Sequence, residues 1–169
     1  MTEPRSAVIL PVPEAAAAVD DWRERTCAAK PSIGVPPHVT LLAPFVAPEE
    51  ISAAVIDELR DVLAVPGFAI ELRELRRFPG TLYLAPEPPQ PFSALTHALV
   101  RRFPGYPPYG DPSLSVIPHL TVAQGDDELL DRAAAEVTSA LPLRAEIRAT
   151  LLLEHDGACW RVRERLPLR

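Results

Sequence analysis

One short pattern occurs twice in this chain and limits the folds that it can adopt. Each copy consists of a proline, a histidine, an apolar residue, a threonine and a second apolar residue, and the copies span Pro37 to Leu41 and Pro118 to Val122. With four histidines and eight threonines among 169 residues, two copies are not expected by chance. Any fold proposed for this chain must therefore present two equivalent His-Thr segments.

The spacing within each copy matches an extended strand. Residues two apart in a strand point to the same side, and the residues between them point to the other. His38 and Thr40 thus share one face, as do His119 and Thr121, while the apolar residues of each copy face a core. We expect two strands with a buried back and a chemically equipped front.

The rest of the chain repeats as well. Apolar periodicity and turn residues predict, in each half, a strand, a helix, a proline-rich loop, the His-Thr strand, a second helix and a final strand. The expected strands are 7–12, 38–45, 68–78, 81–85 and 119–124, the helices begin near 14, 48, 92 and 126, and 143–155 pairs with 159–166 as a hairpin.

This repetition predicts an α+β fold of two pseudo-equivalent lobes, with antiparallel-rich central sheets forming a concave cleft and helices on the outer faces. We expect one domain over residues 1–169, with the first motif at 38–41 and the second at 119–122. A pseudo-twofold arrangement would place the two His-Thr strands side by side, so that both pairs face one cleft.

Composition restricts the function. The formal net charge of −6 disfavours a broad interface with duplex nucleic acid, which requires a basic surface. The apolar stretches are too short to span a bilayer and the N-terminus has no secretory pattern, so we expect a cytoplasmic protein that does not bind membranes. Cys27 and Cys159 lie far apart in sequence, and we interpret them as reduced thiols.

The residue types in the motif are those of phosphoryl transfer by acid–base catalysis. An imidazole gains or loses a proton near neutral pH, so one histidine can activate the attacking oxygen while the other protonates the leaving oxygen. Threonine hydroxyls can donate hydrogen bonds to the non-bridging phosphate oxygens. Neither motif carries further metal ligands at a suitable spacing, and we expect no metal and no cofactor.

These paired motifs resemble the two-histidine (2H) phosphoesterase superfamily, and within it the 2′-5′ RNA ligase-like and cyclic phosphodiesterase group. The resemblance spans essentially the whole chain and is carried by three segments, His38 to Phe45, Phe78 to Leu84 and Pro118 to Ala123. It implies a duplicated α+β fold with a concave central sheet.

The resemblance also implies an activity, which is metal-independent opening of 2′,3′-cyclic phosphates on nucleotides or RNA ends, with the reverse 2′-5′ joining in some members. By the family pattern, His119 would activate water, His38 would protonate the leaving ribose oxygen, and Thr40 and Thr121 would hold the phosphate. From the residues alone, which histidine is acid and which is base stays open.

The chain departs from this pattern after the second motif. Many relatives that act on RNA have a basic residue where this chain has Ala123, Gln124 and Gly125. Together with the acidic charge, this favours a small nucleotide or a short RNA end as the substrate of a monomeric protein. Two alternatives remain, namely a non-catalytic module that binds a nucleotide or RNA end in the same cleft, and a metal site formed by the two histidines.

Other polar and aromatic residues receive simpler interpretations. We expect His97 to be solvated and His155 to be structural. Base stacking and packing both remain open for three tyrosines, and an outer face and a phosphate-facing wall both remain open for five arginines: Tyr83, Tyr106, Tyr109, Arg76, Arg77, Arg161, Arg163 and Arg165.

Overall fold

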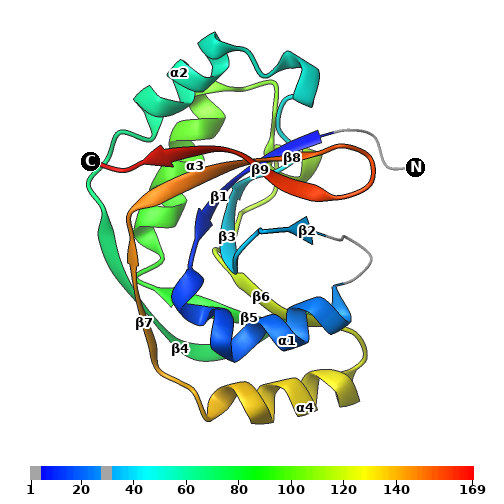
Figure 1. Ribbon diagram of the computed structural model, residues 1–169. Helices are drawn as coiled ribbons and strands as arrows, with labels where there is room; N and C mark the ends of the chain where they lie inside the picture. Colours follow the sequence, from blue (N-terminus) through cyan, green and yellow to red (C-terminus); the bar gives the residue numbers. More distant parts are fainter. Residues whose placement is uncertain (1–4, 28–31) are drawn as a thin grey trace.

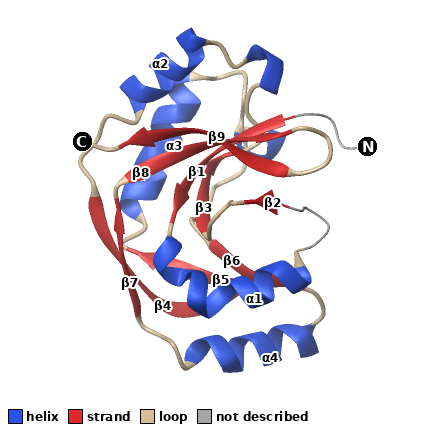
Figure 2. Ribbon diagram, viewed as in Figure 1, coloured by secondary structure: helices blue, strands red, loops and turns tan. Residues whose placement is uncertain are grey.

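A computed structural model describes residues 5–27 and 32–169 of the chain. The described residues form one nine-stranded sheet with the strand order β2-β9-β8-β1-β3-β6-β5-β4-β7 (Figure 1). Every pairing is antiparallel except the short parallel contact between β2 and β9. The sheet is strongly curved, and helices cover its outer side (Figure 2).

The described residues form strands and helices in both halves of the chain. The strands are β1 (Arg5–Pro11), β2 (Ser32–Ile33), β3 (His38–Leu42), β4 (Phe68–Phe78), β5 (Thr81–Glu87), β6 (Leu120–Gln124), β7 (Leu143–Ile147), β8 (Ala149–His155) and β9 (Trp160–Pro167). The α-helices are α1 (Ala16–Thr26), α2 (Ala53–Val62), α3 (Gln90–Arg102) and α4 (Asp127–Thr138). None of these helices, within the described ranges, is long and apolar enough to cross a membrane.

Local sequence signals explain several of the element boundaries. The side chains of Ser52 and Asp126 accept hydrogen bonds from backbone N–H groups in the first turns of α2 and α4, as N-cap residues do. β4 and β5 are joined by a tight turn in which Gly80 has a φ of 71°, a conformation that glycine adopts without steric cost. The predicted turn after Phe78 is therefore confirmed.

The two motif strands occupy the centre of the sheet. β3 and β6 pair with each other, and the strands beyond them correspond in pairs, β1 with β5, β8 with β4 and β9 with β7. This order confirms the predicted α+β fold with two lobes. The lobes share one continuous sheet, because the central strands are hydrogen-bonded across the junction.

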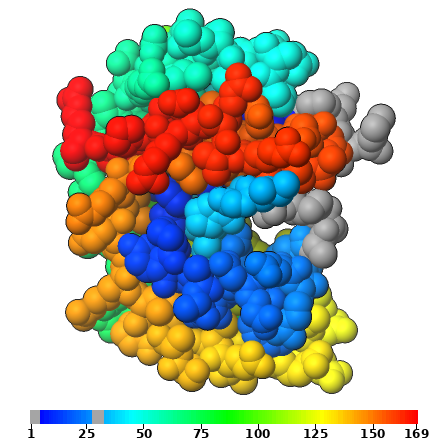
Figure 3. Space-filling view, viewed as in Figure 1, coloured from blue at the N-terminus to red at the C-terminus, as the bar shows by residue number. Residues whose placement is uncertain are grey.

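Each lobe contains elements from both halves of the sequence. Helix α1 packs against β6 and α4, whereas α3 packs against β3 and α2. Likewise β8, from the second half, pairs with β1, and β4, from the first half, pairs with β5. In the space-filling view, the surface is hollowed between α1 and the segment around β2 (Figure 3).

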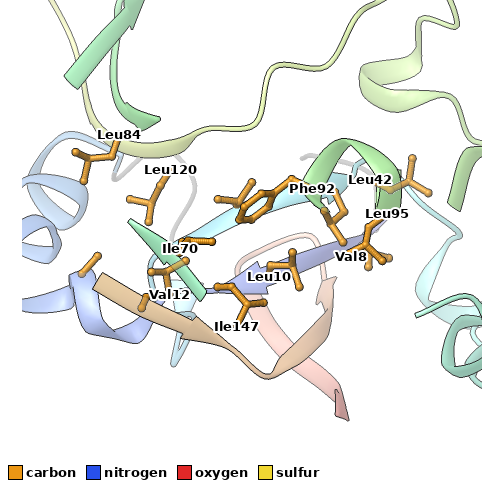
Figure 4. Close-up of a cluster of buried hydrophobic side chains, with 14 of the residues drawn as sticks. Val8, Leu10, Val12, Leu42, Ile70, Leu84, Phe92, Leu95, Leu120 and Ile147 are labelled. Carbon is orange, nitrogen blue, oxygen red and sulfur yellow. The ribbon is translucent and has the colours of Figure 1, made fainter. Parts of the chain in front are cut away.

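A large apolar core lies between the sheet and its helices. Figure 4 shows side chains from both lobes in this core, among them Leu10 and Leu42 of the first and Leu84 and Leu120 of the second. All four are 0% exposed, and burial of a leucine contributes roughly 1.5–3 kcal/mol. The core thus fixes the back of both motif strands.

The predicted C-terminal hairpin is wrong in one respect. Residues 149–155 pair with β9 as expected, but Leu143–Ile147 form a separate strand that pairs with β4 at the far edge of the sheet. Ala145 and Ile147 are buried in the core of that lobe. The chain therefore passes from one lobe to the other between β7 and β8, because the apolar face of residues 143–147 is covered there.

Candidate active site

The register of the central strands brings the two motifs together. Val39 of β3 lies opposite Leu120 of β6 in an antiparallel pairing. In this antiparallel register, the residues on either side of that pair are also opposite each other, so His38 lies opposite Thr121 and Thr40 lies opposite His119. Directly paired residues of neighbouring strands share a face and have Cβ atoms about 4.5–5.5 Å apart. Each histidine is therefore adjacent to the threonine of the other motif.

All four of these side chains are half-buried, whereas the residues between them are fully buried. Val39 and Leu120 are both 0% exposed and belong to the apolar core. The sequence prediction of a buried back and a polar front therefore describes both strands, and it places the four polar side chains on the face away from that core.

The two rings are held in the same way by the backbone. The Nδ1 atom of His38 lies 2.9 Å from the carbonyl oxygen of Pro36, and that of His119 lies 2.7 Å from the carbonyl oxygen of Ile117. A carbonyl oxygen can only accept, so each Nδ1 carries the hydrogen and donates it. In the neutral ring, Nε2 then carries a free lone pair, and Nε2 is the atom available for chemistry.

The proline of each motif explains this contact. A residue that precedes proline is held in an extended conformation. In each motif the carbonyl that accepts the ring hydrogen belongs to that residue, Pro36 before Pro37 and Ile117 before Pro118. The sequence analysis noted both prolines but did not identify the carbonyl two residues before each histidine as the acceptor, although the repeated Pro-His pair was the available signal.

His38 lies in an environment that disfavours a charged ring. Removal from water is the main cause that lowers its pKa, from the ordinary 6.5 to about 4. The hydrogen bond to Pro36 opposes this effect, and the positive charges of Arg23 and His119 add to it. His38 is therefore uncharged in the free protein at neutral pH.

His119 lies against two aromatic rings. Its centroid is 5.1 Å from that of Phe78 and 5.6 Å from that of Tyr83, both in edge-to-face geometry. Phe78 and Tyr83 stack on each other with centroids 4.3 Å apart. Tyr83 is also directly opposite Thr121 on the neighbouring strand. The second motif thus has an aromatic wall, of which Phe78 was quoted from the sequence only as part of the resemblance.

The first motif has an aliphatic wall in the corresponding place. Ile9 lies opposite Thr40, and Leu151 lies opposite Ile9 on the next strand. These two residues belong, with Ala7 and Leu153, to a small apolar cluster separate from the main core, against which the half-buried Val35 packs. The surroundings of the two motifs therefore differ although their central strands are equivalent.

The two remaining histidines lie elsewhere in the fold. His97 is exposed on α3, as expected. His155 is only 4% exposed, accepts a hydrogen bond from the backbone N–H of Gly157 and packs edge-on against Trp160, which agrees with a structural role.

The other tyrosines are divided between packing and exposure. Tyr106 packs against Phe45 with ring centroids 5.3 Å apart. Tyr109 remains 49% exposed, and its backbone N–H donates to the carbonyl of Ala43, just beyond β3. Partial burial raises the pKa of the Tyr109 phenol.

The five arginines left open by the sequence are exposed, and four of them form ion pairs. Arg161 pairs with Asp156 and Arg163 with Glu154, at 3.1 and 2.9 Å. The other two pairs are Arg76 with Glu74 and Arg77 with Asp131. Of these, Arg76 lies opposite Tyr83 and thus in the same row of the sheet as Thr121 and His38.

Few other side chains in the described ranges offer site chemistry. Residues 5–27 and 32–169 contain no group of three or more His, Cys, Asp or Glu side chains placed to hold a metal ion. Cys27 and Cys159 are both free thiols, as the sequence indicated.

Comparison with known proteins identifies relatives of this architecture. The family model of the 2′-5′ RNA ligase superfamily matches residues 11–158. The "Putative phosphoesterase" of Bacillus pumilus (strain SAFR-032) is 30% identical, over 77% of this chain and 78% of that protein.

Solved structures show the same fold at lower identity. TT0787 of Thermus thermophilus has a TM-score of 0.67 at 18% identity and covers 98% of both chains. E. coli LigT complexed with 3′-AMP has a TM-score of 0.64 at 17% identity and covers 98% of this chain and 99% of its own. With the family match over most of its length, this chain belongs to the 2′-5′ RNA ligase superfamily of two-histidine phosphoesterases.

Proposed function

We propose that this protein hydrolyses 2′,3′-cyclic phosphates on nucleotides or short RNA ends, without a metal ion, through His38 and His119. The observation that carries the proposal is the antiparallel pairing of Val39 with Leu120 on the central strands, a register that puts each histidine opposite the threonine of the other motif. A phosphate placed between them would contact one imidazole on each side and a hydroxyl from each strand.

The proposed reaction is an in-line displacement at phosphorus. A water oxygen forms a bond to phosphorus and gives its proton to the free Nε2 of one histidine. The bond from phosphorus to one ribose oxygen breaks, and that oxygen takes a proton from Nε2 of the other histidine. The product is a phosphate monoester beside a free ribose hydroxyl, and proton exchange with solvent restores both rings.

Thr40 and Thr121 would supply the positioning. Their hydroxyls would donate to the non-bridging oxygens, which gain negative charge in the transition state. Because the two threonines come from neighbouring strands of a rigid sheet, the phosphorus would be held with both rings at fixed positions.

The acid role that the resemblance gives to His38 requires a proton that the free ring lacks at neutral pH, since its pKa is about 4. A cyclic phosphate carries one negative charge, and its binding beside the ring would favour the protonated form. Substrate binding would therefore favour protonation of His38, while His119 would accept the proton of water.

Small nucleotides are the substrates that the relatives and the charge of the chain support. E. coli LigT has been crystallised with 3′-AMP, with NADP+ and with ATP. The net charge of −6 and the ion-paired exposed arginines leave little basic surface for a long RNA.

The direct test is incubation with 2′,3′-cyclic mononucleotides and with a short RNA that ends in a cyclic phosphate, in buffer containing EDTA. We expect a monophosphate product, and its identity as the 2′- or 3′-phosphate shows which ribose oxygen leaves. H38N and H119N should each lower kcat by at least about 100-fold, because each removes one proton-transfer group. H97N, which replaces an exposed histidine on α3, is the matched control and should retain full activity.

Two outcomes would contradict the proposal. Full activity in both H38N and H119N would exclude the two-histidine mechanism. Binding of a nucleotide by calorimetry, with no product from any cyclic phosphate, would instead identify a non-catalytic binding module.

A further inference from the structure

Arg23 contacts the backbone carbonyl that holds the ring of His38. Among the hydrogen bonds of the described residues, no other charged side chain outside the two motifs binds the backbone acceptor of a motif histidine. It lies near the end of α1, and its Nη2 donates to the carbonyl oxygen of Pro36 at 3.3 Å. The same oxygen accepts the Nδ1 hydrogen of His38 at 2.9 Å. A carbonyl oxygen has two lone pairs, so it can hold both donors at once.

We propose that Arg23 is a positioning residue that acts through the Pro36 carbonyl, holding His38 with Nδ1 bonded to the backbone and Nε2 turned toward the substrate. This inference rests on the proposed function only for the catalytic consequence, because the arrangement of the His38 ring can be measured without turnover.

Arg23 is itself held firmly in place. Its side chain is 16% exposed and forms an ion pair with Asp20, one helical turn earlier, at 2.5 Å. Helix α1 is fixed to the second lobe at two further points. Trp22 donates to the carboxylate of Glu136 on α4, and Thr26 accepts the backbone N–H of Gln124 at the end of β6. A guanidinium on this helix is therefore a rigid support for Pro36.

The same contact affects the charge of His38. Arg23 lowers the pKa of the ring by Coulomb repulsion, in addition to desolvation. The other titratable group acting on it is His119, which immediately precedes β6. Neighbouring β1 contributes Pro11 opposite His38, and its charged residue, Arg5, lies at the other end of the strand. On the core side, α3 contributes the uncharged Thr96, which donates to the carbonyl of Leu41.

His119 has no such support within residues 5–27 and 32–169. The carbonyl of Ile117 accepts only the ring hydrogen of His119 in the hydrogen bonds of this region. The aromatic rings of Phe78 and Tyr83 contact the imidazole instead. Arg23 therefore distinguishes the first motif from the second.

The test is an NMR titration of the histidine rings in the full-length wild type, R23Q and R25Q. Arg25 is the matched control, because it lies on the same helix with the same charge, pairs with Asp21 and stacks on Trp22 without contacting Pro36. In R23Q we expect the pKa of His38 to rise by about half a unit from about 4, as one like charge is removed. Ring ¹⁵N shifts should also show loss of the single Nδ1–H tautomer, with neither change in R25Q.

Kinetics with a cyclic mononucleotide supply the second measurement. R23Q should lower kcat about three- to tenfold, leave KM within about twofold and move the acidic limb of the kcat/KM profile upward with the NMR pKa. R23K keeps the positive charge and should restore the position of that limb. If R23Q folds poorly, R23K is the variant on which the ring tautomer and kcat are measured.

The inference is overturned if R23Q and wild type have the same His38 pKa and tautomer, or if R25Q changes them as much as R23Q does. If the NMR result holds and no cyclic phosphate is turned over, the proposed function fails while the role of Arg23 in positioning the ring stands.

Discussion

The two motifs share a backbone arrangement and differ in everything that surrounds it. In the first motif, Thr40 lies opposite the aliphatic Ile9, and the backbone acceptor of His38 also binds Arg23. His119 lies beside the aromatic pair Phe78 and Tyr83. The equivalent strands therefore set where the two histidines stand, and the unequal surroundings give each ring different contacts.

A substrate whose leaving group needs no proton should reveal the largest difference between His38 and His119. H38N should lose at least about 100-fold less activity, relative to wild type, on a nucleotide p-nitrophenyl phosphodiester than on a cyclic phosphate. The reason is that p-nitrophenolate leaves without general acid catalysis. H119N should not recover, since water activation is still required. The release of p-nitrophenolate measures both rates.

Recovery of H119N alone would reverse the two roles. Equal recovery of both variants would end the proposed division between acid and base.

The threonines test the part that the motifs have in common. T40V and T121V should each lower kcat by about 10- to 100-fold, since each removes one donor to the phosphate oxygens while keeping the shape of the side chain. We expect similar losses because Thr40 and Thr121 occupy equivalent positions on β3 and β6. T40S and T121S retain the hydroxyl and should keep most of the activity.

A tenfold difference between the T40V and T121V losses would show that the phosphate is held mainly by one strand, and would break the equivalence.

The walls beside the motifs should have smaller effects. F78L should raise KM for a cyclic mononucleotide about three- to tenfold, or about 0.7–1.4 kcal/mol. Stacking on a base contributes roughly 1–3 kcal/mol, and leucine retains part of that apolar contact. I9V, on the aliphatic wall, should leave KM unchanged and cost about 0.5–1.5 kcal/mol of stability, since Ile9 is 1% exposed. Steady-state kinetics and urea unfolding check the two variants.

An equal rise in KM for I9V and F78L would mean that the nucleobase of the substrate does not bind preferentially to the aromatic wall.

The smallest effect concerns stability and pH. The unfolded His38 ring binds a proton near pH 6.5 and the folded ring only near pH 4, so the unfolded state binds more protons between these values. The free energy of unfolding should therefore fall as the pH is lowered through this window. In H38N this contribution is absent, and urea unfolding from pH 7 to 4.5 should show a shallower decline than in wild type or H97N.

An equally steep decline in H38N would mean that other groups carry the acid sensitivity and that His38 titrates normally.

Local patterns were enough to predict most of the fold. The extended segment predicted at 68–78 has the same bounds as β4, and the repeated motif placed two His-Thr strands in a two-lobed fold. What could not be predicted depends on contacts between distant segments. The separation of β7 from β8 arises because each strand pairs in a different lobe, and residues 143–155 show no break in sequence that indicates this.

The site shows the same division between local and distant information. Each Pro-His-x-Thr segment, together with the residue before it, contains the candidate catalytic histidine, the threonine and the backbone acceptor of the ring, since all lie within five residues. Arg23 and Phe78 approach the histidines from α1 and β4, so their placement follows from helix packing and strand order. Sequence alone therefore identified the histidines and threonines that the two motifs share, and the structure supplied the shared backbone acceptors and the contacts that separate the motifs.

The crossing of helices and strands between the lobes makes the two halves of the chain depend on each other. A fragment ending at Gly80 would contain β3 without α3, the helix that covers its apolar face, and would contain α1 without β6, against which that helix packs. Neither fragment can complete a lobe alone, whereas two fragments split at that turn could complete each other. The sheet face that carries both motifs is therefore complete only when both halves of the chain are present.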